Sequence, residues 1–130
     1  MPTAQKIKVL IVEDDSFLAG IYASKFEKEG FKVSLALDGE IALKLVKKDL
    51  PDIILLDVLL PKLDGFEVLE KLKSDSQMRQ IPVVLLTNLG QKEDVDKGLK
   101  LGAADYLIKA HFMPAETVDK VKRVLGASGK

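Results

Sequence analysis

The stretch IILLDVLLPKLDGFEVL, residues 53–69, decides the fold of this chain. Four apolar residues, Ile53 to Leu56, lead to Asp57, and after a loop through Pro61 the segment Asp64-Gly65-Phe66-Glu67 has the spacing of a helix capping box. An apolar strand without alternation is typical of a sheet that is covered by helices on both faces. The stretch therefore predicts a buried strand, a carboxylate at its carboxyl end and a helix after it.

Along the whole chain, β-rich runs alternate with segments whose apolar residues recur at helical spacing. The expected strands are residues 7–12, 32–36, 52–56, 82–86 and 105–109. The expected helices are residues 15–29, a segment capped by Asp38, a segment opened by Asp64, residues 91–101 and residues 115–125. Five strands that alternate with five helices predict an α/β fold with a doubly wound parallel sheet, which binds ligands outside the carboxyl ends of its strands.

Length and composition favour a single domain. The chain has 130 residues, 47% of them hydrophobic, so we expect one globular unit over residues 1–130 with a core of about residues 7–126. Its 20 basic and 20 acidic side chains balance, which gives no reason to expect direct binding to nucleic acid or to an anionic membrane. The absence of cysteine excludes disulfides, thiolate zinc sites and cysteine nucleophiles. No signal peptide or run of ~20 apolar residues is present, so we expect a cytoplasmic protein.

Four of the apolar runs end on polar residues. These residues are Glu13 and Asp14, Asp57, Thr87 and Lys109. Because the carboxyl ends of neighbouring parallel strands meet at one edge of a sheet, we expect these side chains to share one crevice.

The two acids after the first strand have a competing explanation, because an acid there often caps the following helix. Asp15 or Ser16 can supply that cap. Glu13 and Asp14 are then surplus, and they would repel Asp57 in a shared crevice unless a cation lies between them. Oxygen ligands with no histidine or cysteine nearby favour Mg²⁺, with Mn²⁺ as the second choice.

Lys109 is more informative than Thr87, because a threonine at the end of a strand is ordinary. A lysine that ends a buried strand needs a partner for its ammonium group. An acceptor carboxylate, cation ligands, a hydroxyl and an ammonium group together stabilise a phosphoryl group that moves onto the carboxylate. Simple neutralisation of Asp57 by Lys109 remains the alternative.

Together these motifs resemble those of bacterial response-regulator receiver domains, in particular the single-domain kind typified by the chemotaxis response regulator. The motifs are IVED ending at Asp14, LLDVLLPKLDG around Asp57, VVLLTN around Thr87 and DYLIK ending at Lys109, within a resemblance that covers residues 7–126. The resemblance implies a flavodoxin-like sheet with strand order 2-1-3-4-5, and a phosphorylation-dependent signalling switch with no attached output domain.

The resemblance also implies what each acidic residue does. Asp57 would accept a phosphoryl group from a phosphohistidine on a sensor histidine kinase or a histidine phosphotransfer protein. Glu13, Asp14 and Asp57 would hold Mg²⁺, together with the backbone carbonyl of Leu59. Such a domain is not an enzyme for an external substrate, since it catalyses only its own phosphorylation and dephosphorylation.

The remaining family positions form the expected switch. Thr87 and Lys109 would contact the phosphoryl oxygens, and Tyr106 matches the aromatic residue that turns inward as Thr87 moves toward the phosphoryl group. The surface of the fourth helix, the fifth strand and the fifth helix would then change and bind a downstream protein. A partly buried strand aromatic is the simpler explanation of Tyr106.

Several residues depart from the family pattern. Ala110 stands where the family has proline, so either the loop is trans and re-aims Lys109, or a cis bond that costs ~3 kcal/mol is retained. Asn88 is larger than the usual residue and either crowds the phosphoryl pocket or donates a further hydrogen bond. Leu59 is apolar, and we expect it to hinder an attacking water and prolong the life of the phosphoryl group. His111, the only histidine, is expected to be a surface loop residue rather than a relay acceptor.

Three other functions remain to be weighed. A phosphatase or mutase of the haloacid dehalogenase type needs a second aspartate two residues after the first, where this chain has Leu59. A flavodoxin-like cofactor binder needs a hydroxyl- and glycine-rich phosphate loop, whereas EDDSF follows the first strand and would repel phosphate unless a metal ion intervened. A receiver that binds its partner constitutively would not need the intact set of acids, threonine and lysine.

Overall fold

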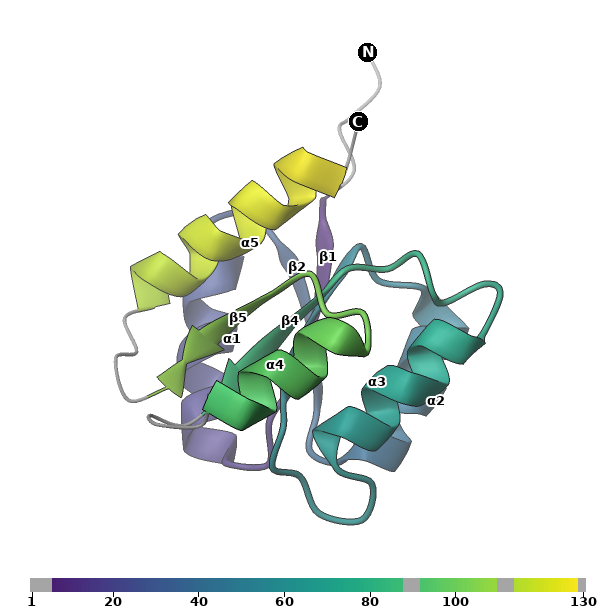
Figure 1. The fold of residues 1–130 in the computed structure, drawn as a ribbon. Coiled ribbons are helices and arrows are strands. Elements are labelled where there is room, and N and C mark those ends of the chain that lie inside the picture. Colours follow the sequence, from purple (N-terminus) through teal and green to yellow (C-terminus); the bar gives the residue numbers. More distant parts are fainter. Residues whose placement is uncertain (1–5, 88–91, 110–113, 129–130) are drawn as a thin grey trace.

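The computed structural model describes residues 6–87, 92–109 and 114–128, which form a parallel sheet flanked by helices (Figure 1). The strands are β1 (Lys8–Val12), β2 (Lys32–Ala36), β3 (Ile53–Asp57), β4 (Val83–Thr87) and β5 (Asp105–Ile108). The helices are α1 (Ser16–Lys28), α2 (Gly39–Asp49), α3 (Gly65–Ser74), α4 (Lys92–Lys100) and α5 (Pro114–Ser128). The alternation of strand and helix expected from the sequence is confirmed.

The sheet has the order β2-β1-β3-β4-β5, and every neighbouring pair is parallel. This is the doubly wound, flavodoxin-like order that the sequence predicted. The chain runs from β1 to β2 on one side and returns to β3 on the other side of β1. The topological switch point therefore lies between the carboxyl ends of β1 and β3, which is where such sheets bind ligands.

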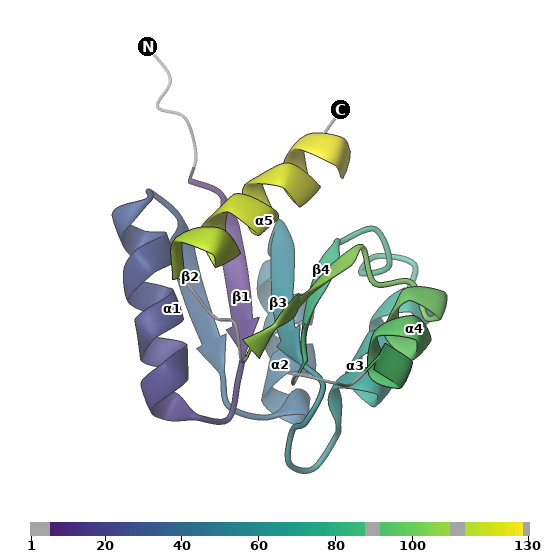
Figure 2. The same cartoon turned by 60° about the vertical axis from the view of Figure 1, so that its left-hand side comes forward.

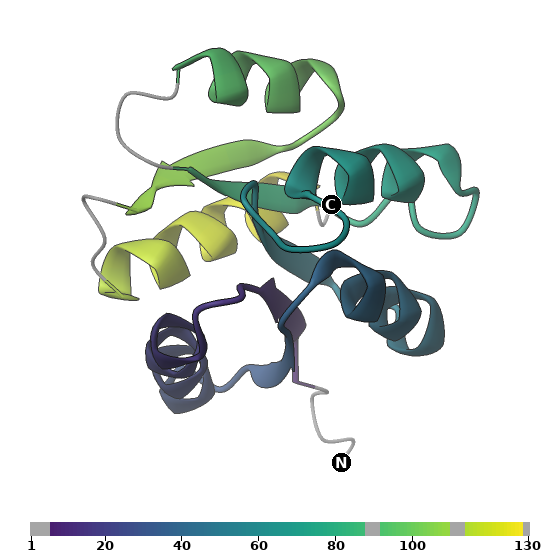
Figure 3. The ribbon, with the colours of Figure 1, turned by 90° about the horizontal axis from the view of Figure 1, so that it is seen from below.

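Two apolar layers cover the sheet. Figures 2 and 3 show α1 and α5 on one face and α2, α3 and α4 on the other. Tyr22 and Phe26 of α1 pack with Val121 of α5 in the first layer, and Val46 of α2 packs with Leu69 of α3 in the second. β3 and β4 are buried along their whole length, which explains why their sequences lack alternation.

Aspartate side chains begin three of the helices. Asp15 accepts from the Leu18 amide at 3.1 Å to cap α1, and Asp38 accepts from the Ile41 amide at 2.9 Å to cap α2. Asp64 forms the expected capping box of α3 with its partner Glu67, at 2.9 and 3.1 Å. Each cap stabilises its helix by about 1 kcal/mol. Since Asp15 caps α1, the two acids before it are not needed for that purpose.

Some boundaries differ from those expected. β3 and β4 each begin and end one residue later than expected, so that they end at Asp57 and Thr87, which pair in register with Leu86 and Ile108 of the next strand. β5 ends one residue early, at Ile108. It is an edge strand of only partly buried residues, so the expectation that Lys109 ends a buried strand was wrong. Among the described residues, no helix is long and apolar enough to cross a membrane.

Candidate functional site

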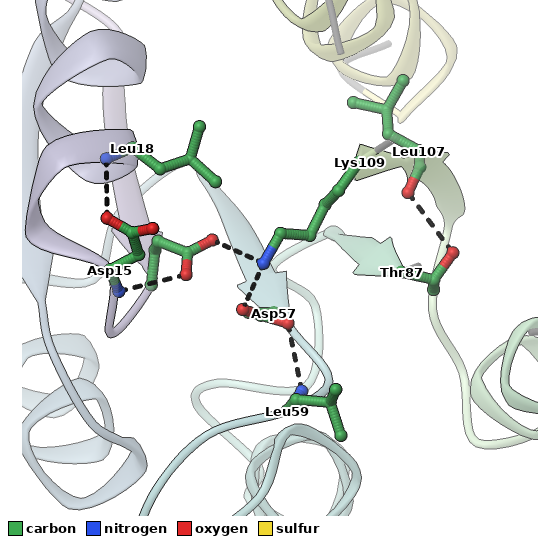
Figure 4. A network of polar contacts seen from close by, with 8 residues as sticks. Asp15, Leu18, Asp57, Leu59, Thr87, Leu107 and Lys109 are labelled. Carbon is green, nitrogen blue, oxygen red and sulfur yellow. Dashed lines mark hydrogen bonds and ion pairs between the residues drawn. The ribbon is translucent and has the colours of Figure 1, made fainter. Parts of the chain in front are cut away.

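The side chains expected at the strand ends lie at the carboxyl edge of the sheet (Figure 4). Asp57 is the last residue of β3, and Thr87 is the last residue of β4. Glu13 and Asp14 follow β1 directly, and Lys109 follows β5. The parallel topology therefore brings polar groups from four strands to the carboxyl edge of the sheet, around the switch point.

Three carboxylates form an acidic cluster here. One oxygen each from Glu13, Asp14 and Asp57 lies within 4.8 Å of the other two. Glu13 and Asp57 are 0% and 2% exposed, whereas Asp14 lies at the surface. The cluster thus has two buried members and one that faces solvent, which leaves an open side from which an ion can enter.

Lys109 places one positive charge against the two buried members of this cluster. Its Nζ donates a hydrogen bond to Asp57 Oδ2 at 2.8 Å and lies 3.1 Å from Glu13 Oε1. Burial lowers the pKa of Lys109, but the hydrogen bond to Asp57 and the charges of both carboxylates outweigh it, so that the pKa is raised overall. Lys109 therefore stays charged, and it reaches the site although its strand lies two places away from β3.

The surroundings of Glu13 neutralise its negative charge only in part. Its Oε2 accepts from the Asp15 amide at 3.2 Å, but Oε1 has no hydrogen bond within the described residues, because its contact with Lys109 is an ion pair without hydrogen-bond geometry. Burial first, and then the charge of Asp57, raise the pKa of Glu13 to about 7.

One ammonium group facing three carboxylates leaves room for a further positive charge. The buried Oε1 of Glu13, which lacks a hydrogen bond, and the all-oxygen donor set match the preference of Mg²⁺ or Mn²⁺. The residues present therefore fit a hard divalent cation. Glu13, Asp14 and Asp57 are the side chains that would hold it.

The backbone after Asp57 orients the Asp57 carboxylate. The Leu59 amide donates to Asp57 Oδ1 at 3.0 Å, while Lys109 holds Oδ2. Both carboxylate oxygens are therefore fixed from opposite sides, as Figure 4 shows. The Leu59 side chain is 60% exposed.

Thr87 is at the site but does not point at Asp57. Its hydroxyl donates a long hydrogen bond of 3.5 Å to the Leu107 carbonyl, on the side away from Asp57 in Figure 4. Tyr106, on β5, is half-buried, and Lys120 Nζ of α5 lies 5.9 Å from its ring centroid. The structure therefore brings the acids and Lys109 together, and it leaves the Thr87 hydroxyl and Tyr106 outside their contacts.

Tyr22, a core residue of α1, also lies close to the site and was not predicted as part of it. Its side chain is 1% exposed, and burial together with the charges of Glu13 and Asp57 raises its pKa. No sequence signal distinguishes it from its apolar neighbours. The expectations for Asn88, for the Lys109–Ala110 bond and for His111 concern residues outside the described ranges.

Comparison with known proteins gives the family of this fold and site. Residues 9–122 match the response regulator receiver domain. Among solved structures, the Vibrio cholerae chemotaxis response regulator CheY4 is 30% identical with a TM-score of 0.87, over 93% of this chain and 100% of that one. The receiver domain of the Francisella response regulator 1452 is 34% identical with a TM-score of 0.86, over 95% and 99%.

Curated relatives are longer than this chain. The chain is 40% identical to the alkaline phosphatase synthesis transcriptional regulatory protein PhoP of Bacillus subtilis, over 93% of this chain and 49% of PhoP. It is 46% identical to the response regulator PleD of Caulobacter vibrioides, over 78% of this chain and 22% of PleD. The chain thus spans half or less of these relatives. With the family match over residues 9–122, the fold and the acidic edge, it belongs to the receiver domains of two-component response regulators.

Proposed function

We propose that this domain is a phosphorylation-dependent switch that accepts a phosphoryl group on Asp57. The observation that carries the proposal is the arrangement around that carboxylate. Asp57 is buried, it is held by Lys109 at 2.8 Å and by the Leu59 amide at 3.0 Å, and two further acids lie beside it. A carboxylate used only for structure would not need an acidic cluster around it, because each added acid raises its electrostatic cost.

The proposed donor is a phosphohistidine on a sensor histidine kinase or a histidine phosphotransfer protein. A carboxylate oxygen of Asp57 forms a bond to phosphorus while the bond from phosphorus to the imidazole nitrogen breaks. The electron pair of that bond returns to the imidazole, which takes up a proton from solvent. The products are an acyl phosphate on Asp57 and a free histidine, so no other reactant is needed.

Charge neutralisation is the main requirement of this step, since the phosphoryl oxygens approach a site that already holds carboxylates. Lys109 supplies one fixed positive charge at Asp57 Oδ2. Mg²⁺, held by Glu13, Asp14, Asp57 and the Leu59 carbonyl, would stabilise the charge on the phosphoryl oxygens when bound. Thr87 supplies a hydroxyl that can donate to them once it leaves the Leu107 carbonyl.

The proposed output is a change in the surface formed by α4, β5 and α5. The Thr87 hydroxyl has only a 3.5 Å hydrogen bond to give up, so its movement toward a phosphoryl group costs little. Tyr106 lies on β5 next to β4, where it pairs in register with Leu85. We propose that it turns inward when Thr87 moves, and that the altered surface binds a downstream protein rather than nucleic acid.

In this proposal the domain has no external substrate, and it catalyses only its own phosphorylation and dephosphorylation. The experiment that tests it uses phosphoramidate, which supplies a phosphoryl group without a kinase. The purified protein is incubated with phosphoramidate and Mg²⁺, then reduced with borohydride, which converts an aspartyl phosphate to homoserine. Peptide mass spectrometry should find homoserine at position 57. Homoserine at another position, or none, would contradict the proposal.

Leu59→Asn is expected to shorten the life of the phosphorylated form. The exposed Leu59 side chain stands beside the acceptor, and an amide in its place would admit and orient the attacking water. We expect hydrolysis to accelerate by about three- to tenfold, which corresponds to roughly 1 kcal/mol in the barrier. The rate of hydrolysis is measured as the decay of phosphoprotein after phosphoramidate is removed. Leu35→Asn, at a similarly exposed leucine of β2, should leave the decay unchanged, and an equal effect of both variants would refute the explanation.

A further inference from the structure

The loop between β3 and α3, residues 58–64, begins at the Asp57 side chain and closes back onto its own first residue. At its start the Leu59 amide donates to Asp57 Oδ1, and at its end the Gly65 amide donates to the Val58 carbonyl at 3.0 Å. Gly65 packs so closely that a Cβ there would overlap the Asp57 carbonyl oxygen and lie 2.6 Å from Val58 Cα. The start of the loop therefore holds the Asp57 carboxylate, and its end packs against the backbone of Asp57 and Val58.

The middle of this loop rests on the beginning of α2. A Cβ at Gly39 would overlap the carbonyl oxygen of Leu63 and lie 2.8 Å from Leu63 Cβ. It would also lie 2.7 Å from Val68 Cγ2 of α3. The missing side chain at Gly39 is thus what allows the loop to approach α2 this closely.

Lys62 gives the loop the turn that it needs to reach Gly39. Its φ is +67°, in the left-handed region that residues with a Cβ seldom adopt. Its Nζ lies 3.7 Å from Asp38 Oδ2, but the Lys62 side chain is 61% exposed, so this ion pair adds little. The left-handed backbone, rather than the charge, is therefore the feature that determines the position of Leu63.

We propose that Gly39 and the left-handed turn at Lys62 are positioning residues for the cation and phosphoryl site. They act through the loop, which carries the Leu59 carbonyl and orients the Asp57 carboxylate. They contact neither the Asp57 carboxylate oxygens nor the phosphorus atom. This inference rests on the proposed function of Asp57. Its consequence is that two residues outside the acidic cluster set the affinity of that cluster for Mg²⁺.

Gly39→Ala tests the close approach. Alanine favours the first turn of α2, but its Cβ pushes the loop away from the helix. We expect Mg²⁺ affinity, measured by calorimetry, to fall by about tenfold or more, and phosphorylation by phosphoramidate to slow with it. Gly20→Ala is the matched control, because it also adds a Cβ to a helix but meets no atom within 4 Å. Equal Mg²⁺ affinity of the two variants would overturn the role of Gly39.

Lys62→Val and Lys62→Asn keep the inference testable should Gly39→Ala fold poorly. Both remove the ammonium group at an exposed position, but asparagine tolerates the left-handed conformation and a β-branched residue does not. We expect Val to weaken Mg²⁺ binding several-fold and Asn to stay within about twofold of the wild type. Equal values for Val and Asn would overturn the role of the turn, whether both are impaired or both are normal.

The wild type separates the failure of this inference from the failure of the proposed function. If the wild type neither binds Mg²⁺ nor accepts a phosphoryl group, the proposed function fails and the positioning role fails with it. If the wild type does both and the variants match their controls, only the positioning role is overturned. Urea unfolding of each variant without Mg²⁺ should show intact folds, so that a loss of affinity is not a loss of structure.

Discussion

We expect Asp57→Asn to abolish phosphorylation by phosphoramidate, with a rate at least about a thousandfold below that of the wild type. The amide cannot act as the nucleophile, and Glu13, the other buried carboxylate of the cluster, is held by the Asp15 amide. Phosphate-affinity electrophoresis of the reaction mixture measures the loss. Asp119→Asn, at an exposed aspartate of α5, should be phosphorylated like the wild type.

The same substitution should not destabilise the fold. Burial and the charge of Asp57 raise the pKa of Glu13, so removing that charge relieves a repulsion, and Lys109 keeps Glu13 as its partner. We expect the free energy of unfolding in the absence of Mg²⁺ to stay within about 1 kcal/mol of the wild type or to rise. A large loss of stability would mean that Asp57 is a structural residue, contrary to the proposed function.

We expect Lys109→Met to have the second large effect, on both the free energy of unfolding and the rate of phosphorylation. It leaves two buried carboxylates without their cation, at a site where the lysine side chain is 20% exposed. We expect the free energy of unfolding without Mg²⁺ to fall by about 2–3 kcal/mol. Mg²⁺ at a hundredfold excess over its dissociation constant should restore about 2.7 kcal/mol, because it binds only the folded protein. Phosphorylation should slow by about a hundredfold through the loss of one fixed charge.

Lys122→Met is the control, because it removes a lysine ammonium group that lies away from the acidic cluster. Lys122 Nζ lies 3.2 Å from Glu29 Oε1, but its side chain is 51% exposed. Such a pair contributes little, so we expect a change of no more than about 0.5 kcal/mol, with no dependence on Mg²⁺. Urea unfolding of both variants, with and without Mg²⁺, makes the comparison. If Lys109→Met is as stable as Lys122→Met, the buried acids do not depend on Lys109.

The fold was predictable because each element carries its own local signal. Asp38 and Asp64 mark the beginnings of α2 and α3, and the apolar strands show burial on both faces directly in their composition. Close packing between elements carries no such local signal. At Gly98 of α4, for example, a Cβ would overlap Leu85 Cδ1 of β4, so the glycine allows α4 to pack closely on β4.

The site was predictable only in part, since it is assembled from residues far apart in the chain. The positions of Glu13, Asp57 and Lys109 follow from strand ends and parallel topology, which sequence patterns carry. The direction of the Thr87 hydroxyl and the proximity of Tyr22 depend on side-chain packing, for which spacing gives no signal. The contact between Gly39 and Leu63 depends on a left-handed backbone at a lysine, which composition does not reveal.

Beryllofluoride binding tests the central claim most directly, because this phosphoryl mimic binds only where a carboxylate and a cation act together. Fluorine NMR would follow binding to the wild type and to Asp57→Asn, with and without Mg²⁺. Ring signals of the two tyrosines, assigned with Tyr106→Phe, would report the switch. We predict Mg²⁺-dependent binding with a shift of the Tyr106 signal in the wild type alone. Equal binding by Asp57→Asn, or binding by the wild type without Mg²⁺, would contradict the account.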